Sequence, residues 1–142
     1  MSAARGLYTP EVLAAAMELV GFPWTEALAQ QGSARSRSCG STITMGVSLD
    51  EQGRIAMLGL KPHACAVGQA AAAIFARSAK GRTIADVANA RQAIAGWLAD
   101  ERTMPDWPGL DLLDTAKGYP ARHGAILLAW DAALDALKSP AI

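Results

Sequence analysis

Apolar and polar residues alternate strictly in the segment 42–50, the most regular pattern in the chain. Its apolar positions are Ile43, Met45, Val47 and Leu49. A period of two predicts a β-strand with one buried face. Asp50-Glu51-Gln52-Gly53 has the composition of a turn. The segment from 54 to about 61 is apolar again, at Ile55, Met57, Leu58 and Leu60. The two segments therefore predict an antiparallel β-hairpin.

Other segments place apolar residues at helical spacing. The first helix is expected from Thr9, a good N-cap, to the stop sequence Gly21-Phe22-Pro23. Its apolar side would consist of Val12, Leu13, Ala16, Met17 and Val20. Further helices are predicted at about 66–79, 84–98 and 121–137, with a short one at 110–116. Thr83 and Asp86 are spaced as a capping pair for the helix at 84–98.

The segment between the first helix and the hairpin has a less regular pattern. Residues 24–31 suggest at most a short edge strand, and residues 32–38 are small, polar and basic, which predicts a mobile loop. No internal repeat and no second domain are evident. The sequence thus predicts an α+β fold in one domain spanning 1–142, with a core at about 7–137. In it, a small antiparallel sheet of about three strands is covered on one face by helices.

Composition excludes several classes of protein. Thirteen basic residues balance thirteen acidic ones, so no basic field indicates a nucleic-acid partner. No apolar run approaches the ~18 residues of a membrane-spanning helix. The first residues lack the apolar stretch of a secretory signal, and we therefore expect a cytoplasmic protein. Two cysteines in a reducing compartment more often indicate metal or redox chemistry than a structural disulfide.

The two cysteines flank the predicted hairpin. Cys39 precedes its first strand and Cys65 follows its second, so antiparallel pairing should make them neighbours at one end of the sheet. Cys65 also stands at the predicted start of a helix, where unpaired N–H groups and the helix dipole favour thiolate over thiol. The alternative is that Cys65 acts as a small buried apolar residue.

Five motifs in this order resemble the family of iron–sulfur cluster assembly scaffolds that comprises the NifU N-terminal domain, IscU and SufU. They are Tyr8-Thr9-Pro10-Glu11-Val12-Leu13, Cys39-Gly40, Cys65 before a small-residue helix, Ala79-Lys80-Gly81-Arg82-Thr83-Ile84 and Tyr119-Pro120-Ala121-Arg122. The resemblance covers about residues 7 to 137. It implies a scaffold or carrier for iron or a [2Fe–2S] cluster, without enzymatic turnover. The implied partners are a cysteine desulfurase and acceptor apoproteins.

The chain departs from the family pattern at two places. Ser41 replaces the aspartate of the Cys-Gly-Asp motif, and the third cysteine, expected within Gly124-Ala125, is missing. His123 stands close to the position of the family's ligand-loop histidine. The resemblance therefore carries over Cys39 and Cys65 as cluster ligands, with His123 as a further candidate.

Histidine can complete either metal site that two cysteines begin. It replaces cysteine in some [2Fe–2S] centres, and tetrahedral zinc accepts two cysteines and two histidines. His63 and Cys65 are two residues apart and share a face if the strand continues between them. The candidate ligands are thus Cys39, Cys65, His123 and His63. The simpler alternatives are a solvated His63, a His123 that hydrogen-bonds within the core, and a Ser41 that caps a backbone N–H.

Three functions remain open at this stage. The first is the iron–sulfur scaffold or carrier, the second a zinc-binding accessory in sulfur transfer, and the third an interaction protein that keeps the fold without metal. A metal-bridged homodimer is a further arrangement, in which two protomers each contribute Cys39 and Cys65.

Overall fold

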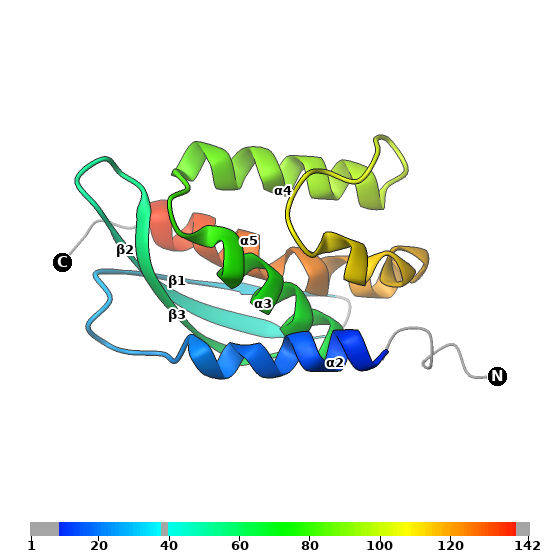
Figure 1. The fold of residues 1–142 in the computed structure, drawn as a ribbon, viewed down its shortest axis with the longest axis horizontal. Coiled ribbons are helices and arrows are strands. Elements are labelled where there is room, and N and C mark those ends of the chain that lie inside the picture. Colours follow the sequence, from blue (N-terminus) through cyan, green and yellow to red (C-terminus); the bar gives the residue numbers. More distant parts are fainter. Residues whose placement is uncertain (1–8, 38–39, 139–142) are drawn as a thin grey trace.

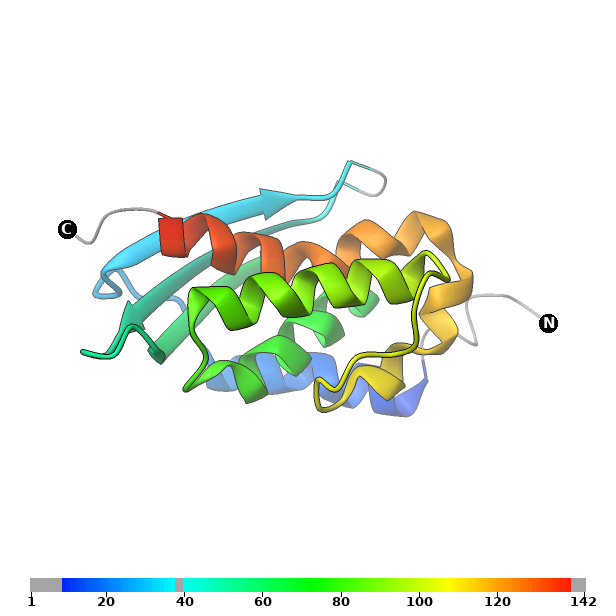
Figure 2. The same cartoon turned by 90° about the horizontal axis from the view of Figure 1, so that it is seen from above.

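The structure, a computed structural model, describes residues 9–37 and 40–138. A three-stranded antiparallel sheet of order β1-β2-β3 carries the longer helices on one face (Figures 1 and 2). The helices are α2 (Pro10–Met17), α3 (Ala66–Ala79), α4 (Ile84–Leu98) and α5 (His123–Lys138). The strands are β1 (Gln30–Arg35), β2 (Thr42–Leu49) and β3 (Ile55–His63). Short 3₁₀ turns are η1 (Glu18–Gly21), η2 (Leu110–Leu113), η3 (Thr115–Gly118) and η4 (Pro120–Arg122). The predicted α+β class and sheet are confirmed.

The hairpin forms where the alternation predicts it. β2 and β3 pair antiparallel from Thr42 opposite His63 to Leu49 opposite Ile55, with an irregularity at Ser48/Leu49. The turn is closed by Asp50, whose carboxylate accepts the backbone N–H groups of Gln52 and Arg54 at 2.9 and 3.0 Å. Gly53 adopts the positive φ of 76° that the turn requires. The irregularity leaves Leu49 partly exposed, whereas the other three alternating apolar side chains of β2 are fully buried.

The prediction of a loop at 32–38 is wrong for residues 32–35. These residues belong to β1, which continues to Arg35 and pairs with β2 along its length. Small residues are needed here because α5 crosses closely. A methyl group added at Gly32 would lie 2.2 Å from the backbone nitrogen of Ala136. The side chain of Asp135 accepts the backbone N–H of Ser33 at 2.9 Å. The small residues that suggested a loop are therefore those of a strand that lies under a helix.

The face of the sheet opposite the helices is covered in part by the segment that leads into β1. Leu28 is 4 % exposed and sits over two glycines of neighbouring strands, Gly46 and Gly59. A methyl group at Gly46 would approach the Leu28 side chain to 2.8 Å. The same segment closes the outer edge of β3, since the Leu60 N–H donates to the Phe22 carbonyl at 3.0 Å. This closure protects an edge strand from pairing with another chain.

The predicted helix caps are present, but the buried side of the first helix differs from its apolar stripe. Thr9 accepts the N–H of Val12, and Thr83 forms a full capping box with Asp86. In α2 the buried residues are Val12 and Ala15, whereas Leu13 and Met17 of α2 and Val20 of η1 are exposed. α2 contacts mainly α3. A helix that packs against a single neighbour buries only a narrow stripe of residues. Periodicity alone does not show which stripe that is.

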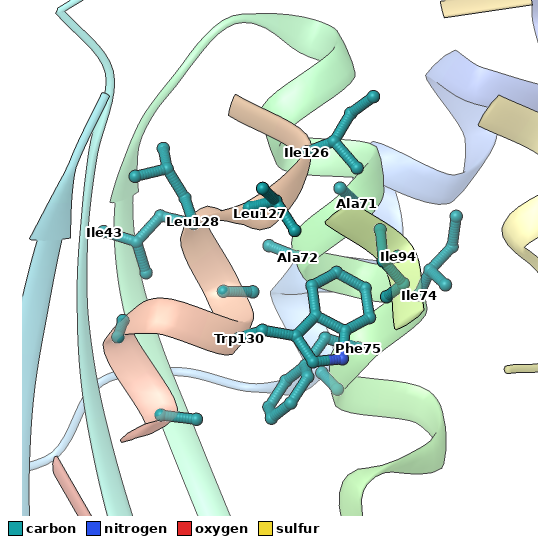
Figure 3. Close-up of a cluster of buried hydrophobic side chains, with 14 of the residues drawn as sticks. Ile43, Ala71, Ala72, Ile74, Phe75, Ile94, Ile126, Leu127, Leu128 and Trp130 are labelled. Atoms are coloured by element: carbon teal, nitrogen blue, oxygen red, sulfur yellow. The ribbon is translucent and has the colours of Figure 1, made fainter. Parts of the chain in front are cut away.

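The core lies between α3, α5 and the sheet. α3 is buried nearly all round, and its alanines allow close approach by its neighbours. Phe75 of α3 stacks on Trp107 at 5.5 Å and meets the edge of Trp130 of α5 at 5.3 Å between ring centroids; Figure 3 shows Phe75 and Trp130 among aliphatic side chains. Trp107 donates its indole N–H to the Ile74 carbonyl at 3.0 Å. No helix of the described residues is long and apolar enough to cross a membrane.

Replacing Gly32 by alanine should push α5 away from β1. The added methyl group collides with helix backbone, which has no rotamer to change, so we expect a loss of about 1–3 kcal/mol in the free energy of unfolding. Urea denaturation measures it. Gly21→Ala is the matched control, because no heavy atom lies within 4 Å of the added methyl group. Equal stability of both variants would contradict the close approach of α5 to β1 at Gly32.

Asp86 makes stability depend on pH. The backbone N–H of Thr83 holds the pKa of Asp86 below its ordinary value of 3.8. The contribution of the carboxylate is therefore present above that value and is lost as pH falls through the lowered pKa. We expect Asp86→Asn to be less stable than wild type at neutral pH and to approach it in acid. Asp106→Asn, which removes an exposed carboxylate without a hydrogen bond among the described residues, should show no such convergence.

Candidate functional site

Cys65 stands at the junction of β3 and α3, as predicted. It is the N-cap residue of α3, with φ −65° and ψ 169°, and its side chain makes no capping hydrogen bond. The thiol is free and half-buried. The backbone around it is fixed, because the Cys65 carbonyl accepts the N–H of Gln69 at 2.9 Å and the Gln69 side chain donates to the Ala64 carbonyl at 2.8 Å. A rigid backbone thus presents a partly accessible sulfur.

Ser41 connects the beginning of β2 to Cys65. Its hydroxyl accepts the backbone N–H of Cys65 at 3.4 Å, and the serine is only 5 % exposed. The Ser41 carbonyl accepts the N–H of Ser36 at 2.8 Å, and Gly40 donates to the Ser36 carbonyl at 3.0 Å. Among the alternatives for Ser41, capping of a backbone N–H is confirmed.

Cys39 itself lies outside the described residues, so its predicted proximity to Cys65 stays a prediction. Ser41, two positions further along the chain, is described and contacts Cys65. The pairing of Thr42 with His63 places the start of β2 and the end of β3 side by side. The part of the hairpin argument that falls on described residues therefore holds.

The first turn of α5 lies against the first turn of α3. A methyl group added at Gly68 would lie 3.5 Å from the Cβ of Ala125. Ala125 is fully buried at this contact, in the stretch where the resemblance expects a third cysteine. His123 begins α5 two residues earlier. The fold therefore brings the starts of β2, α3 and α5 to one end of the sheet.

His123 is partly buried, and one of its ring nitrogens is engaged. Nε2 lies 2.7 Å from the backbone carbonyl oxygen of Lys117. Because a carbonyl oxygen only accepts, Nε2 carries the hydrogen in this contact. The expectation of a hydrogen bond within the fold is thus met for His123. The sequence analysis missed Lys117, because its carbonyl reaches His123 only through the 3₁₀ turns η3 and η4.

His63 is the last residue of β3 and is exposed. Within residues 9–37 and 40–138, no three or more side chains of His, Cys, Asp or Glu form a group that could hold a metal ion. His63, Cys65 and His123 therefore do not make such a group by themselves. The four-residue set that includes Cys39 stays a prediction.

Comparison with known proteins gives structural matches only. No protein-family model and no curated protein matches the sequence. The fold is similar to the crystal structure of a nitrogen-fixing NifU-like protein (N-terminal) from Brucella abortus. That match has a TM-score of 0.85 and 25 % identity and covers 96 % of each chain. It is also similar to a putative iron–sulfur cluster assembly scaffold protein for the SUF system from Fervidobacterium islandicum AW-1. Here the TM-score is 0.79 with 21 % identity, and 93 % of this chain and 97 % of that chain are covered.

These matches identify the architecture. The chain has a NifU/IscU/SufU-like fold, with a three-stranded antiparallel sheet and helices arranged as in those structures. The resemblance read from five short motifs is confirmed at the level of fold.

Removing the Ser41 hydroxyl should loosen the start of α3. Ser41→Ala leaves the partly buried N–H of Cys65 without its acceptor, so we expect a loss of about 1 kcal/mol in the free energy of unfolding and faster hydrogen exchange at the Cys65 amide. Ser78→Ala, in α3, is the control, because its hydroxyl makes no hydrogen bond among the described residues. Unchanged exchange at Cys65 in Ser41→Ala would refute the capping role.

Proposed function

We propose that the chain is an iron–sulfur scaffold or carrier that holds iron or a [2Fe–2S] cluster as cargo and passes it to acceptor apoproteins. The observation that carries the proposal is Cys65, a free, half-buried thiol at the N-terminus of α3 in a NifU/IscU/SufU-like fold. A partly accessible sulfur on a fixed backbone suits a ligand that must bind cargo and release it. The printed descriptions of the two similar structures refer to NifU-like and scaffold proteins, which agrees with this role.

The proposed ligands are Cys39 and Cys65 through sulfur, with His123 and His63 through nitrogen. A [2Fe–2S] cluster takes four protein ligands, and histidine substitutes for cysteine in some centres. His123 fits this role in one respect that the structure supplies: it begins α5, whose first turn contacts the first turn of α3 next to Cys65. His63 ends β3 two residues before Cys65. The protein would bind and orient cargo and needs no turnover chemistry.

The proposed partners are a cysteine desulfurase, which supplies sulfur, and acceptor apoproteins, which take the cluster. At the start of α5 the chain offers no thiol, because position 125 is a buried alanine packed against Gly68. Any sulfur handed to this protein would therefore have to arrive at Cys39 or Cys65, the two thiols of the chain.

Metal and sulfide analysis of protein purified without oxygen tests the function. We expect a coloured protein with iron and sulfide, both lost in Cys65→Ser and in Cys39→Ser. Met57→Ala is the matched control, because it removes the sulfur of an exposed methionine in β3 and leaves both cysteines in place. Stoichiometric zinc without colour would replace this proposal by the zinc-accessory alternative. If neither iron nor zinc is bound, even after reconstitution, both are refuted and an interaction protein that keeps the fold without metal is favoured.

The oligomeric state separates two ligand arrangements. If one protomer supplies all ligands, the loaded protein stays monomeric and His123→Ala weakens metal binding about ten- to hundredfold. If two protomers share a cluster through Cys39 and Cys65, metal drives dimer formation and His123→Ala changes little. Light scattering with and without metal distinguishes them. The closeness of the α3 and α5 first turns favours the single-protomer arrangement.

A further inference from the structure

The outer edge of β3 is closed at two places and open between them. At one place Ile55 forms two backbone hydrogen bonds of 2.9 Å with residues 81–82. At the other, the Leu60 N–H donates to the Phe22 carbonyl at 3.0 Å. Beyond Leu60, Pro62 has no N–H to offer to another strand. A further strand can therefore pair with β3 only between Ile55 and Leu60.

The register of the sheet directs the backbone of Leu58 out of that opening. In an antiparallel pair, every second residue points both its N–H and its carbonyl away from the partner strand. Leu60 does so, because its N–H reaches Phe22, and Leu58 stands two positions before it in an uninterrupted register with β2. No described residue forms a hydrogen bond with these outward groups of Leu58. One backbone donor and one backbone acceptor are thus available at the edge.

A pocket of about 240 Å³ lies beside this position, and Leu58 is one of its lining residues. Its walls are mainly apolar and include Phe22, Pro23 and the exposed side chain of Met57. Among the described residues no acidic side chain lines the pocket, whereas Lys80 does. Lys80 is exposed and forms no ion pair within the described part of the chain. The pocket therefore combines apolar walls, an open strand edge and a positive charge.

We propose that this pocket binds a short extended peptide segment of a partner protein, in which an apolar side chain neighbours a carboxylate. The peptide backbone pairs with Leu58 as an added strand, and its apolar side chain enters the pocket beside Met57. The carboxylate pairs with Lys80. In this mode of recognition, main-chain hydrogen bonds supply affinity and a side-chain pocket supplies specificity.

A second copy of the chain fits this edge less well than a peptide does. Pairing of two β3 edges would bring two Lys80 side chains to one interface, where like charges repel. The opening between Ile55 and Leu60 is also short, about 15 Å at the rise of an extended strand. That length accommodates about five residues of a single peptide, whereas β3 itself has nine.

The pocket is distant from the proposed metal ligands. Cys65 and Lys80 are the N-cap and the C-cap of the same helix, α3, which has 14 residues. At 1.5 Å per residue the two caps are about 21 Å apart. A peptide bound beside Lys80 leaves the Cys65 thiol uncovered. The inference therefore goes beyond the proposed function and does not depend on it.

Hydrogen exchange of the intact, metal-free chain tests whether the edge is open. We expect the Leu58 amide to exchange at least about tenfold faster than the Leu60 amide, because only the latter donates to a backbone carbonyl, that of Phe22. Equal protection of the two amides in the monomer would overturn the proposal. Protection of Leu58 that rises with protein concentration, together with dimers in light scattering, would assign the edge to a second copy instead.

A peptide titration tests the occupant. The probe is the capped peptide Asp-Val-Leu-Val-Asp, with Lys-Val-Leu-Val-Lys as its charge-reversed counterpart. We expect the acidic peptide to slow exchange at the Leu58 amide. Lys80→Glu should bind it about three- to tenfold more weakly and should prefer the basic peptide. Arg102→Glu is the matched control, because it reverses an exposed charge just beyond α4 and should retain wild-type affinity.

The outcomes that contradict the proposal concern the charge and the backbone separately. Equal losses in Lys80→Glu and Arg102→Glu, or no protection of Leu58 by millimolar acidic peptide, would overturn it. The acidic peptide methylated on the backbone nitrogens of its three apolar residues cannot donate to the strand edge and should no longer protect Leu58. Undiminished protection by the methylated peptide would refute strand addition.

Discussion

The close approach of α5 to its neighbours is the constraint on which the rest of the structure depends. The distance between packed elements is set by the side chains at their contact. α5 meets β1 at Gly32 and α3 at Gly68, two positions without side chains. Because the gap is so small, polar groups can bridge it: Asp135 reaches the backbone of Ser33, and Gln30 donates to the Ala136 carbonyl at 3.2 Å. The aromatic cluster around Trp130 can be dense only while this distance is kept.

The same closeness creates the candidate site. The beginnings of β2, α3 and α5 meet at one end of the sheet, where regular hydrogen bonding stops and backbone groups need other partners. Ser41 supplies the acceptor for the Cys65 N–H, and His123 supplies the donor for the Lys117 carbonyl. Both polar contacts therefore join ends of different elements. They fix the backbones at this end of the sheet, while the Cys65 side chain makes no capping hydrogen bond.

Local features of the fold could be predicted from the sequence because the interactions responsible are themselves local. The alternation at 42–50 and the Asp50–Gly53 turn specify the hairpin, and Thr83 with Asp86 specifies the start of α4. The hairpin in turn places the start of β2 beside the end of β3. The hydrogen bond from the Cys65 N–H to the Ser41 hydroxyl joins these two ends. The position of Cys65 at the start of a helix was also predicted from the local pattern of apolar residues. Order and spacing of short motifs were sufficient for the fold class.

Tertiary contacts determined several features that the local sequence pattern could not predict. Residues 32–34 are small where α5 passes over β1, closest at Gly32, whereas their composition alone suggests a loop. Of the predicted apolar side of the first helix, Val12 is buried whereas Leu13, Met17 and Val20 are exposed, because the position of α3 selects the face that α2 buries. The partner of His123 is a backbone carbonyl, and every residue has one, so no side-chain signal marks Lys117. The sequence by itself determined the hairpin, the caps and the place of Cys65. The packing of α5 determined the length of β1 and the contact between the two first turns, since such contacts join residues distant in the chain.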